Sequence, residues 1–314
     1  MAELNQRARR FSLNNPTLEQ TLKSTLALIL RFLLLTVVYF VAFTIVAGLI
    51  LPHPPQSPTA TESQTIFTAL LVISLLNTAV VTYLLGCSQW GSLKLVVALW
   101  VVLFGVTTVM PQIETAVFIR NLPPGFLPRL ILNGFVFSFV FSMLAVTIFK
   151  KWRSTTSSIA CPQLSLANWI VRLSFIAVVY VILYFSFGYF IAWQNPAVVA
   201  YYGGTNSGSF IQQMTHVIRD TPWLVLLQIF RALLWTALAI PVIRMMTGAW
   251  WEAGLAVAFL FSVVMNTQLL LPNPLMPPEV RMTHLVETAT SNFLFGWLLV
   301  VILRPLSTDT LRYD

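Results

Sequence analysis

Apolar residues gather in about eight continuous blocks of roughly twenty, and this feature limits the fold more than any other. A helix rises about 1.5 Å per residue, so such a block spans the roughly 30 Å hydrocarbon core of a bilayer. The blocks lack the alternation that a barrel strand needs between its lipid and lumen faces. The sequence therefore predicts an all-α fold, a polytopic helical membrane bundle of about eight spans.

Composition leads to the same conclusion. Hydrophobic residues make up 57% of the 314 residues and charged residues only 9%, with a mean hydropathy of +0.81. A soluble domain has a charged fraction near one quarter, so a soluble fold is excluded. The net charge of +8 does not indicate nucleic acid, because the basic residues are scattered among the connections between blocks. The partners expected from this composition are membrane lipids, with no nucleic acid.

The expected spans are residues 25–51, 66–86, 93–110, 129–149, 169–192, 223–247, 253–271 and 283–303. Lysine and arginine concentrate in both tails and in every second connection, whereas the other connections hold few. This asymmetry is the positive-inside pattern. It predicts cytoplasmic amino and carboxy termini in a plasma membrane, and the compact connections favour a bacterial inner membrane.

An internal duplication is the second large-scale feature. The tripeptide Val-Val-Tyr at 37–39 recurs at 178–180, and Arg31 recurs at the same offset as Arg172. Two further matches in the same order are Trp90 with Trp251 and Pro123 with Pro277. An even number of spans in each unit gives both units the same orientation, so the pattern predicts a parallel 4+4 tandem repeat.

This duplication predicts the domain organisation. The expected parts are a cytoplasmic tail (1–24), a first four-span repeat (25–153), a cytoplasmic linker (154–168), a second four-span repeat (169–304) with an extracytoplasmic insertion (193–222), and a cytoplasmic tail (305–314).

The insertion 193–222 has no counterpart in the first half. Apolar residues recur in it at three- and four-residue spacing, namely Phe210, Ile211, Met214, Val217 and Ile218. This spacing predicts an amphipathic helix, either lying in the headgroup region or packed on the bundle as a loop helix. The insertion is also the candidate docking surface for a membrane-protein partner.

Polar residues concentrate in the second half, where they form the candidate ligand-binding site. An ionisable side chain at mid-span costs about 2.5–3.5 kcal/mol, so it needs a partner or a polar cavity. Arg231 lies deep in the sixth expected span, with Gln228 on the same helical face. The other candidates are Asn266, Gln268, His284, Glu287 and Asn292 in the last two spans and His216, Arg219 and Asp220 in the insertion.

Two interpretations of this cluster stay open at this stage. Arg231 and Glu287 could form a buried ion pair that fixes helix register. Alternatively the cluster is a pocket that opens outward, with Glu114 of the first half facing it. The corresponding first-half positions carry no charge, with Leu70 for Arg231 and Asn133 for Glu287. This difference favours a specialised site in the second half.

Three classes of function fit these residues. The leading hypothesis is binding or transport of a small anion, a zwitterion or a lipid headgroup, because arginine suits carboxylate and phosphate. The second is an enzyme acting on a lipid-linked substrate, with His284 or Glu287 as general base. The third is an accessory subunit of a membrane complex. A single His-x-x-Glu is weak support for a metal site, and the histidines give little support for haem, so no cofactor is predicted.

Overall fold

The protein is described from a computed structural model that covers residues 18–52, 58–119, 122–153, 165–204, 208–247, 249–273 and 275–303. Eight helical segments in these ranges are long and apolar enough to cross a membrane, which confirms the predicted helical, multi-pass architecture. The linker predicted at residues 154–168 lies mostly outside the described residues. Both predicted tails do so too, apart from the end of the first, where the first helix has begun.

The first four spans contain five α-helices and one π-helical turn. They are α2 (Leu18–Ile50), α3 (Ala60–Cys87), α4 (Ser92–Phe104) with η1 (Gly105–Val109) and α5 (Met110–Phe118), and α6 (Phe126–Ile148). The last four are α7 (Leu166–Phe190), α10 (Pro222–Met245), α11 (Trp250–Phe259) with η3 (Leu260–Val264) and η4 (Thr267–Leu270), and α12 (Pro278–Leu303).

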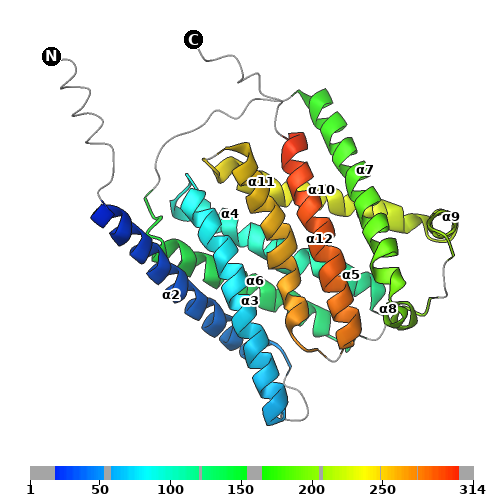
Figure 1. Cartoon of the computed structure of the whole chain (residues 1–314), viewed down its shortest axis with the longest axis horizontal. Coiled ribbons are helices and arrows are strands. Elements are labelled where there is room, and N and C mark those ends of the chain that lie inside the picture. Colours follow the sequence, from blue (N-terminus) through cyan, green and yellow to red (C-terminus); the bar gives the residue numbers. More distant parts are fainter. Residues whose placement is uncertain are drawn as a thin grey trace.

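The described chain begins and ends on the same side of the bundle (Figure 1). We call this the terminal side, and the other the far side. On the far side, the connection between α7 and α10 contains η2 (Ala192–Gln194), α8 (Pro196–Tyr201) and α9 (Phe210–Asp220). The predicted helix in the insertion is thus present as α9, which is seen end-on in Figure 1 while α7 runs across the view.

The third span is longer than the sequence indicated. It was expected to end before Pro111, yet the helical segment continues to Phe118. The main-chain N–H of Met110 bonds to Gly105, five residues back, and so closes a wide π-helical turn immediately before Pro111. Because proline has no N–H to donate, this wider turn lets the chain pass it without a break. As a consequence Glu114 lies inside the span rather than in a connection.

The same pairs of helices pack together in both halves. In the first half the first helix, α2, packs on α3 and α6, and α4 packs on α6. In the second half α7 packs on α10 and α12, and α11 packs on α12. Between the halves, α10 packs on α4, and α3 packs on α11, η3 and η4. The central helices therefore come from both halves.

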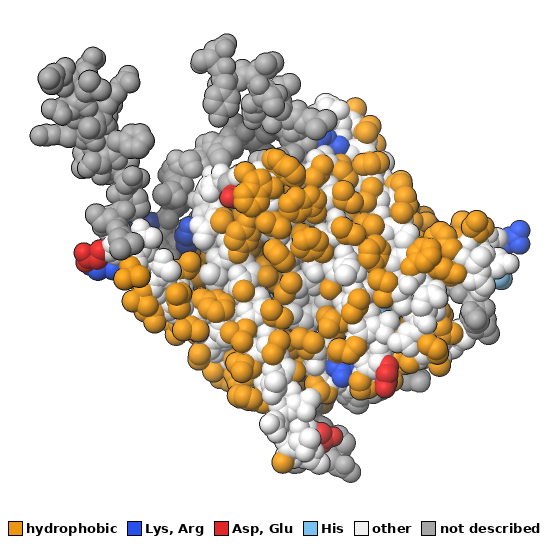
Figure 2. All heavy atoms as spheres, viewed as in Figure 1, with side chains coloured by type: hydrophobic (Ala, Val, Ile, Leu, Met, Phe, Trp, Pro, Cys, Tyr) orange, Lys and Arg blue, Asp and Glu red, His pale blue; other side chains and the backbone are white. Residues whose placement is uncertain are grey.

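One continuous apolar core runs through both halves. Tyr39 of α2 meets Phe137 and Phe141 of α6 edge-on, with ring centroids 5.0 Å apart in each case. In the second half Tyr180 of α7 lies 4.7 Å from Phe295 of α12. Outside this core, hydrophobic side chains cover the visible flank of the bundle and charged ones lie toward its edges (Figure 2). Such a surface is stable only with lipid as its solvent.

The two halves are also joined by main-chain bonds on the terminal side. Ser88 and Met246 form an isolated antiparallel bridge between the connection that precedes α4 and the one that precedes α11. The N–H of Gln89 donates to the carbonyl of Met245 at 2.8 Å, and the N–H of Thr247 donates to the carbonyl of Cys87 at 3.1 Å. These bonds hold the two connections side by side.

Candidate functional site

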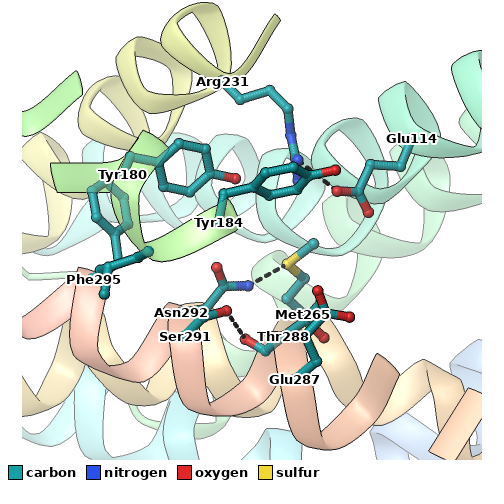
Figure 3. A pocket seen from close by; sticks show the side chains of 11 residues that line it. Glu114, Tyr180, Tyr184, Arg231, Met265, Glu287, Thr288, Ser291, Asn292 and Phe295 are labelled. Atoms are coloured by element: carbon teal, nitrogen blue, oxygen red, sulfur yellow. Dashed lines mark hydrogen bonds and ion pairs between the residues drawn. The ribbon is translucent and has the colours of Figure 1, made fainter. Parts of the chain in front are cut away.

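A small cavity lies between α5, α7, α10 and α12, toward the far side of the bundle (Figure 3). Its volume is about 20 Å³, which is room for about one water molecule. Its polar lining comprises Glu114, Tyr180, Tyr184, Arg231, Glu287, Thr288, Ser291 and Asn292, and its apolar lining comprises Leu183, Met265 and Phe295. We call this the polar pocket.

Arg231 is held by Glu114 and not by Glu287. Its Nη1 lies 2.5 Å from Oε1 of Glu114, and the arginine side chain is only 2% exposed while that of Glu114 is 28% exposed. Figure 3 shows the guanidinium of Arg231 directed at Glu114. The suggested Arg231–Glu287 pair is therefore wrong, because the extension of the third span brings Glu114 closer. The ion pair joins the two halves, since Glu114 comes from α5 and Arg231 from α10.

The surroundings of the arginine are polar on one side and aromatic on the other. Gln228, one turn earlier in α10, accepts a hydrogen bond from Nη1 of Arg231 at 2.9 Å. The rings of Tyr180 and Tyr184 each lie 5.8 Å from the guanidinium carbon, within the range of cation–π attraction. These contacts offset part of the cost of keeping a guanidinium away from water.

Two buried donors beside the ion pair lack an acceptor. Nε of Arg231 and Nε2 of Gln228 are both inaccessible to solvent and have no hydrogen-bond partner among the described residues. Gln228 itself is completely buried. An unpaired buried donor costs about 1–3 kcal/mol, so Arg231 favours a ligand atom that accepts hydrogen bonds. Gln228 is not among the residues that line the pocket.

His284 and Glu287 form a second pair on α12. Nδ1 of His284 lies 2.7 Å from Oε2 of Glu287, and their side chains are 18% and 10% exposed. The other ring nitrogen of His284 lies 3.1 Å from the hydroxyl of Tyr202. Burial raises the pKa of Tyr202, which therefore keeps its proton. The result is a hydrogen-bonded chain from the far-side connection to a carboxylate of the polar pocket.

A further group of α12 side chains anchors the pocket to the seventh span. The hydroxyl of Thr288 donates to Oδ1 of Asn266 at 2.5 Å, and Asn266 donates to the carbonyl of Ser262 at 2.7 Å. Nδ2 of Asn292 donates to the sulfur of Met265 at 3.1 Å. Of these candidates, Asn292 lines the pocket and Asn266 supports Thr288 from behind.

The remaining sequence candidates lie elsewhere. Nε2 of Gln268 donates to the carbonyl of Thr107 at 2.9 Å and so ties the seventh span to the third. His216 and Asp220 pair with each other along α9, with side chains 76% and 68% exposed. Arg219, between them, is also exposed. These three insertion residues were expected above the site, but none of them lines the polar pocket.

The two pocket tyrosines were missed by the sequence reasoning. Tyr180 belongs to the Val-Val-Tyr tripeptide that recurs in the first half, and Tyr184 lies one helical turn later on the same face. The recurrence of the tripeptide and the four-residue spacing of the two tyrosines could therefore have placed both of them among the site candidates. Met265 carries no comparable signal, because an apolar residue in an apolar span is expected anywhere.

Metal-ligating side chains and similar proteins are the two remaining sources of a functional assignment. No three histidine, cysteine, aspartate or glutamate side chains of the described ranges come together in an arrangement that could hold a metal ion. Comparison with known proteins adds no assignment, because no protein family, no curated protein and no solved structure matches this chain. The functional argument therefore depends on the geometry alone.

Proposed function

We propose that this membrane protein binds and transports a small zwitterion, either a free metabolite or a zwitterionic lipid headgroup, in the polar pocket. The observation that carries the proposal is the pairing of opposite charges there. Arg231 and two carboxylates, Glu114 and Glu287, line one small buried cavity. Buried charges of both signs suit a ligand that also carries both.

The unpaired donors specify where each end of the ligand would bind. A carboxylate or phosphate of the ligand would accept from Arg231, which lines the pocket and whose Nε has no acceptor among the described residues. An ammonium group would lie between the carboxylates of Glu114 and Glu287. A simple anion fits less well than was expected from the sequence, because Glu114 already offsets the charge of Arg231.

The proposal requires a closed state and an open state, of which the small pocket would represent the closed one. A cavity of about 20 Å³ admits no ligand of this class, whereas ligand sites usually occupy about 300–1,000 Å³. Ligand entry therefore requires α7 or α12 to move. A Cβ at Gly188 of α7 would lie 3.5 Å from Oε1 of Glu287, in ordinary van der Waals contact, so a movement of α7 away from α12 would separate these two residues.

The proposal includes a parallel 4+4 repeat and an orientation in the membrane. The matching helix pairs of the two halves support the repeat. Lys94, Lys150, Lys151 and Arg244 lie at span ends on the terminal side, which supports cytoplasmic termini by the positive-inside rule. In this orientation the polar pocket lies in the outer leaflet of a plasma membrane.

The test is ligand-dependent thermal stabilisation of the purified full-length chain. The probes are glycerophosphoethanolamine and alanine, two zwitterions, compared with glycerol 3-phosphate, which carries only negative charge, and ethanolamine, which carries only positive charge. A zwitterion at about 100 times its Kd should stabilise the protein by about 2.7 kcal/mol and raise the Tm by several degrees. Glu287→Gln should abolish this shift.

The matched control is Glu252→Gln, which removes a half-buried carboxylate from α11 outside the pocket and should leave the shift intact. Two results would contradict the proposal. One is stabilisation by glycerol 3-phosphate equal to that by either zwitterion, which would mean a simple anion site. The other is no shift with any of the four probes.

A second candidate function is that of an accessory subunit that docks a partner on α9. The observation in its favour is the apolar face of that helix, on which Ile211 is 76% and Ile218 65% exposed. Phe210 anchors the helix through ring contacts with Tyr189 and Phe190. Copurification of a partner that is lost on Ile211→Ser/Ile218→Ser, without loss of the zwitterion shift, would favour this function.

A further inference from the structure

A second, unrelated concavity lies between α4 and α10 on the terminal side of the bundle. It has a volume of about 510 Å³ and is formed by Trp90, Leu93, Lys94, Val97, Ala98, Val101, Ile240, Pro241 and Arg244. We call it the α4/α10 groove. None of its lining residues also lines the polar pocket. Its volume falls in the usual range of ligand sites, about 300–1,000 Å³.

The groove combines apolar walls with a basic end. Leu93, Val97 and Val101 of α4 are exposed along one wall, with Ile240 of α10 on the other. Lys94 lies in the first turn of α4 and Arg244 in the last turn of α10, so both cations lie at the end of the groove nearest the terminal side. The groove therefore has the shape and polarity of a lipid, with a long apolar part and one charged end.

The two cations have no acidic partner in the part of the chain that the structure describes. In the ranges that the structure describes, no carboxylate forms an ion pair with Lys94 or Arg244. Nζ of Lys94 lies 3.9 Å from the ring centroid of Trp90, which holds the ammonium beside the groove without removing its charge. Tryptophan at a span end also prefers the headgroup level of a bilayer.

Two residues without long side chains, Pro241 and Ala98, are among those that line the groove. Pro241 is inside α10 and has no N–H, so the carbonyl of Ala237 loses its helical donor at this level. Ala98 presents only a small side chain on the opposite helix. A bulky residue at either position would fill the groove, whereas this pair of residues leaves it open.

From this combination we infer that the α4/α10 groove is a binding site for an anionic phospholipid of the leaflet on the terminal side. The phosphate lies between Lys94 and Arg244, and one acyl chain follows Leu93, Val97 and Val101. The site joins the two halves of the bundle, because α4 belongs to the first half and α10 to the second. Its occupancy does not depend on the zwitterion proposed for the polar pocket.

The test uses the full-length chain in nanodiscs of phosphatidylcholine, with or without phosphatidylglycerol. Native mass spectrometry counts bound phosphatidylglycerol, and thermal unfolding measures its stabilising effect. A cation near the membrane surface contributes about fivefold in affinity, so Lys94→Gln and Arg244→Gln should each weaken phosphatidylglycerol binding about fivefold. Val97→Trp, which fills the apolar wall without changing charge, should weaken binding too.

The matched control is Lys23→Gln, which removes one exposed lysine near the same side of the bundle, far from the groove in sequence. It should leave phosphatidylglycerol binding unchanged. An equal loss in Lys23→Gln and Lys94→Gln would overturn the inference in favour of diffuse surface charge. Unchanged binding in Val97→Trp would overturn it as well, because no acyl chain would then occupy the groove. Equal Tm values in pure phosphatidylcholine check that all variants fold.

Discussion

The two halves of the molecule place a buried tyrosine in the same kind of site but give it different neighbours. In the first half, the hydroxyl of Tyr39 accepts a hydrogen bond from Asn77 at 2.7 Å, and Asn77 in turn accepts one from Thr267. In the second half, Tyr180 accepts one from Trp235 at 3.3 Å and lies beside the Arg231 guanidinium. Neutral groups are thus sufficient to surround a buried tyrosine in this bundle. The stability of the fold alone therefore does not explain the charged groups around Tyr180.

The largest expected effect comes from breaking the ionic cluster. Arg231→Met leaves the carboxylate of Glu114 half-buried without its partner, and removing one member of a buried pair costs about 3–5 kcal/mol. The expected result is a large fall in Tm, measured by thermal unfolding in detergent. The double variant Arg231→Met/Glu114→Gln should regain part of that loss.

Additive losses in the double variant would contradict the pairing of these two residues. They would also weaken the contrast between the ionic surroundings of Tyr180 and the neutral surroundings of Tyr39. The same double variant should lose the zwitterion-dependent shift completely, because the pocket would have neither its guanidinium nor its first carboxylate.

A smaller loss of stability is expected when a glycine in the last helix of either half, α6 or α12, is replaced by alanine. In α12, a Cβ at Gly296 would lie 2.9 Å from Cα of Ala258, which is main chain and cannot give way. In α6, a Cβ at Gly134 would collide with the Thr108 side chain instead. Overpacking costs about 1–3 kcal/mol, so Gly296→Ala and Gly134→Ala should both lower the Tm.

Only the second of these losses should be reversible. Thr108→Ala in combination with Gly134→Ala removes the obstructing side chain and should restore most of the Tm. No side-chain substitution can compensate Gly296→Ala in this way, because its Cβ meets main-chain atoms. If no second substitution rescues Gly134→Ala, the α6 contact is as rigid as the α12 contact and the two halves pack alike at this point.

The neutral site of the first half should give a still smaller effect. Asn77→Leu removes the hydrogen bonds to Tyr39 and Thr267, and a polar contact within a membrane contributes about 0.6 kcal/mol on average. A loss of about 1 kcal/mol is therefore expected in thermal unfolding. A loss as large as that of Arg231→Met would show that the neutral network is as important to the fold as the charged one.

The smallest effect is expected at the exposed ion pair of Lys23 and Glu19 near the start of α2. Both side chains are about three-quarters exposed, so water screens their attraction. Lys23→Gln should leave the Tm unchanged within error. A measurable fall would indicate that the end of α2 packs against something other than solvent.

The fold could be predicted from the sequence largely because lipid imposes one requirement on every span. Runs of apolar residues, bounded by polar or proline-rich connections, located all eight segments to within a few residues at most ends. Helices α2, α3 and α12 begin several residues earlier than predicted, at Leu18, Ala60 and Pro278. The largest difference is the end of the third span, because the π-helical turn that carries the chain past Pro111 depends on main-chain bonding such as that between Met110 and Gly105. No pattern of side chains records such a bond.

The candidate site was predictable only in part. Helical spacing correctly brought His284 next to Glu287 and Gln228 next to Arg231, because each pair shares one helical face. The partner of Arg231 was not predictable, since the choice between Glu114 and Glu287 depends on how two distant helices rotate about their axes. His216 shows the same limit, because a position in a connection says little about the direction of its side chain.

The main-chain bridge between Ser88 and Met246 has a consequence for how this protein can tolerate change. Its bonds use the peptide groups of residues 87, 89, 245 and 247, which every amino acid except proline carries. Point substitutions that do not introduce proline at these positions therefore leave the bridge intact. The two halves then stay connected at that end whatever changes inside either half. Either half can therefore change its interior side chains without loosening the connection between the halves on the terminal side.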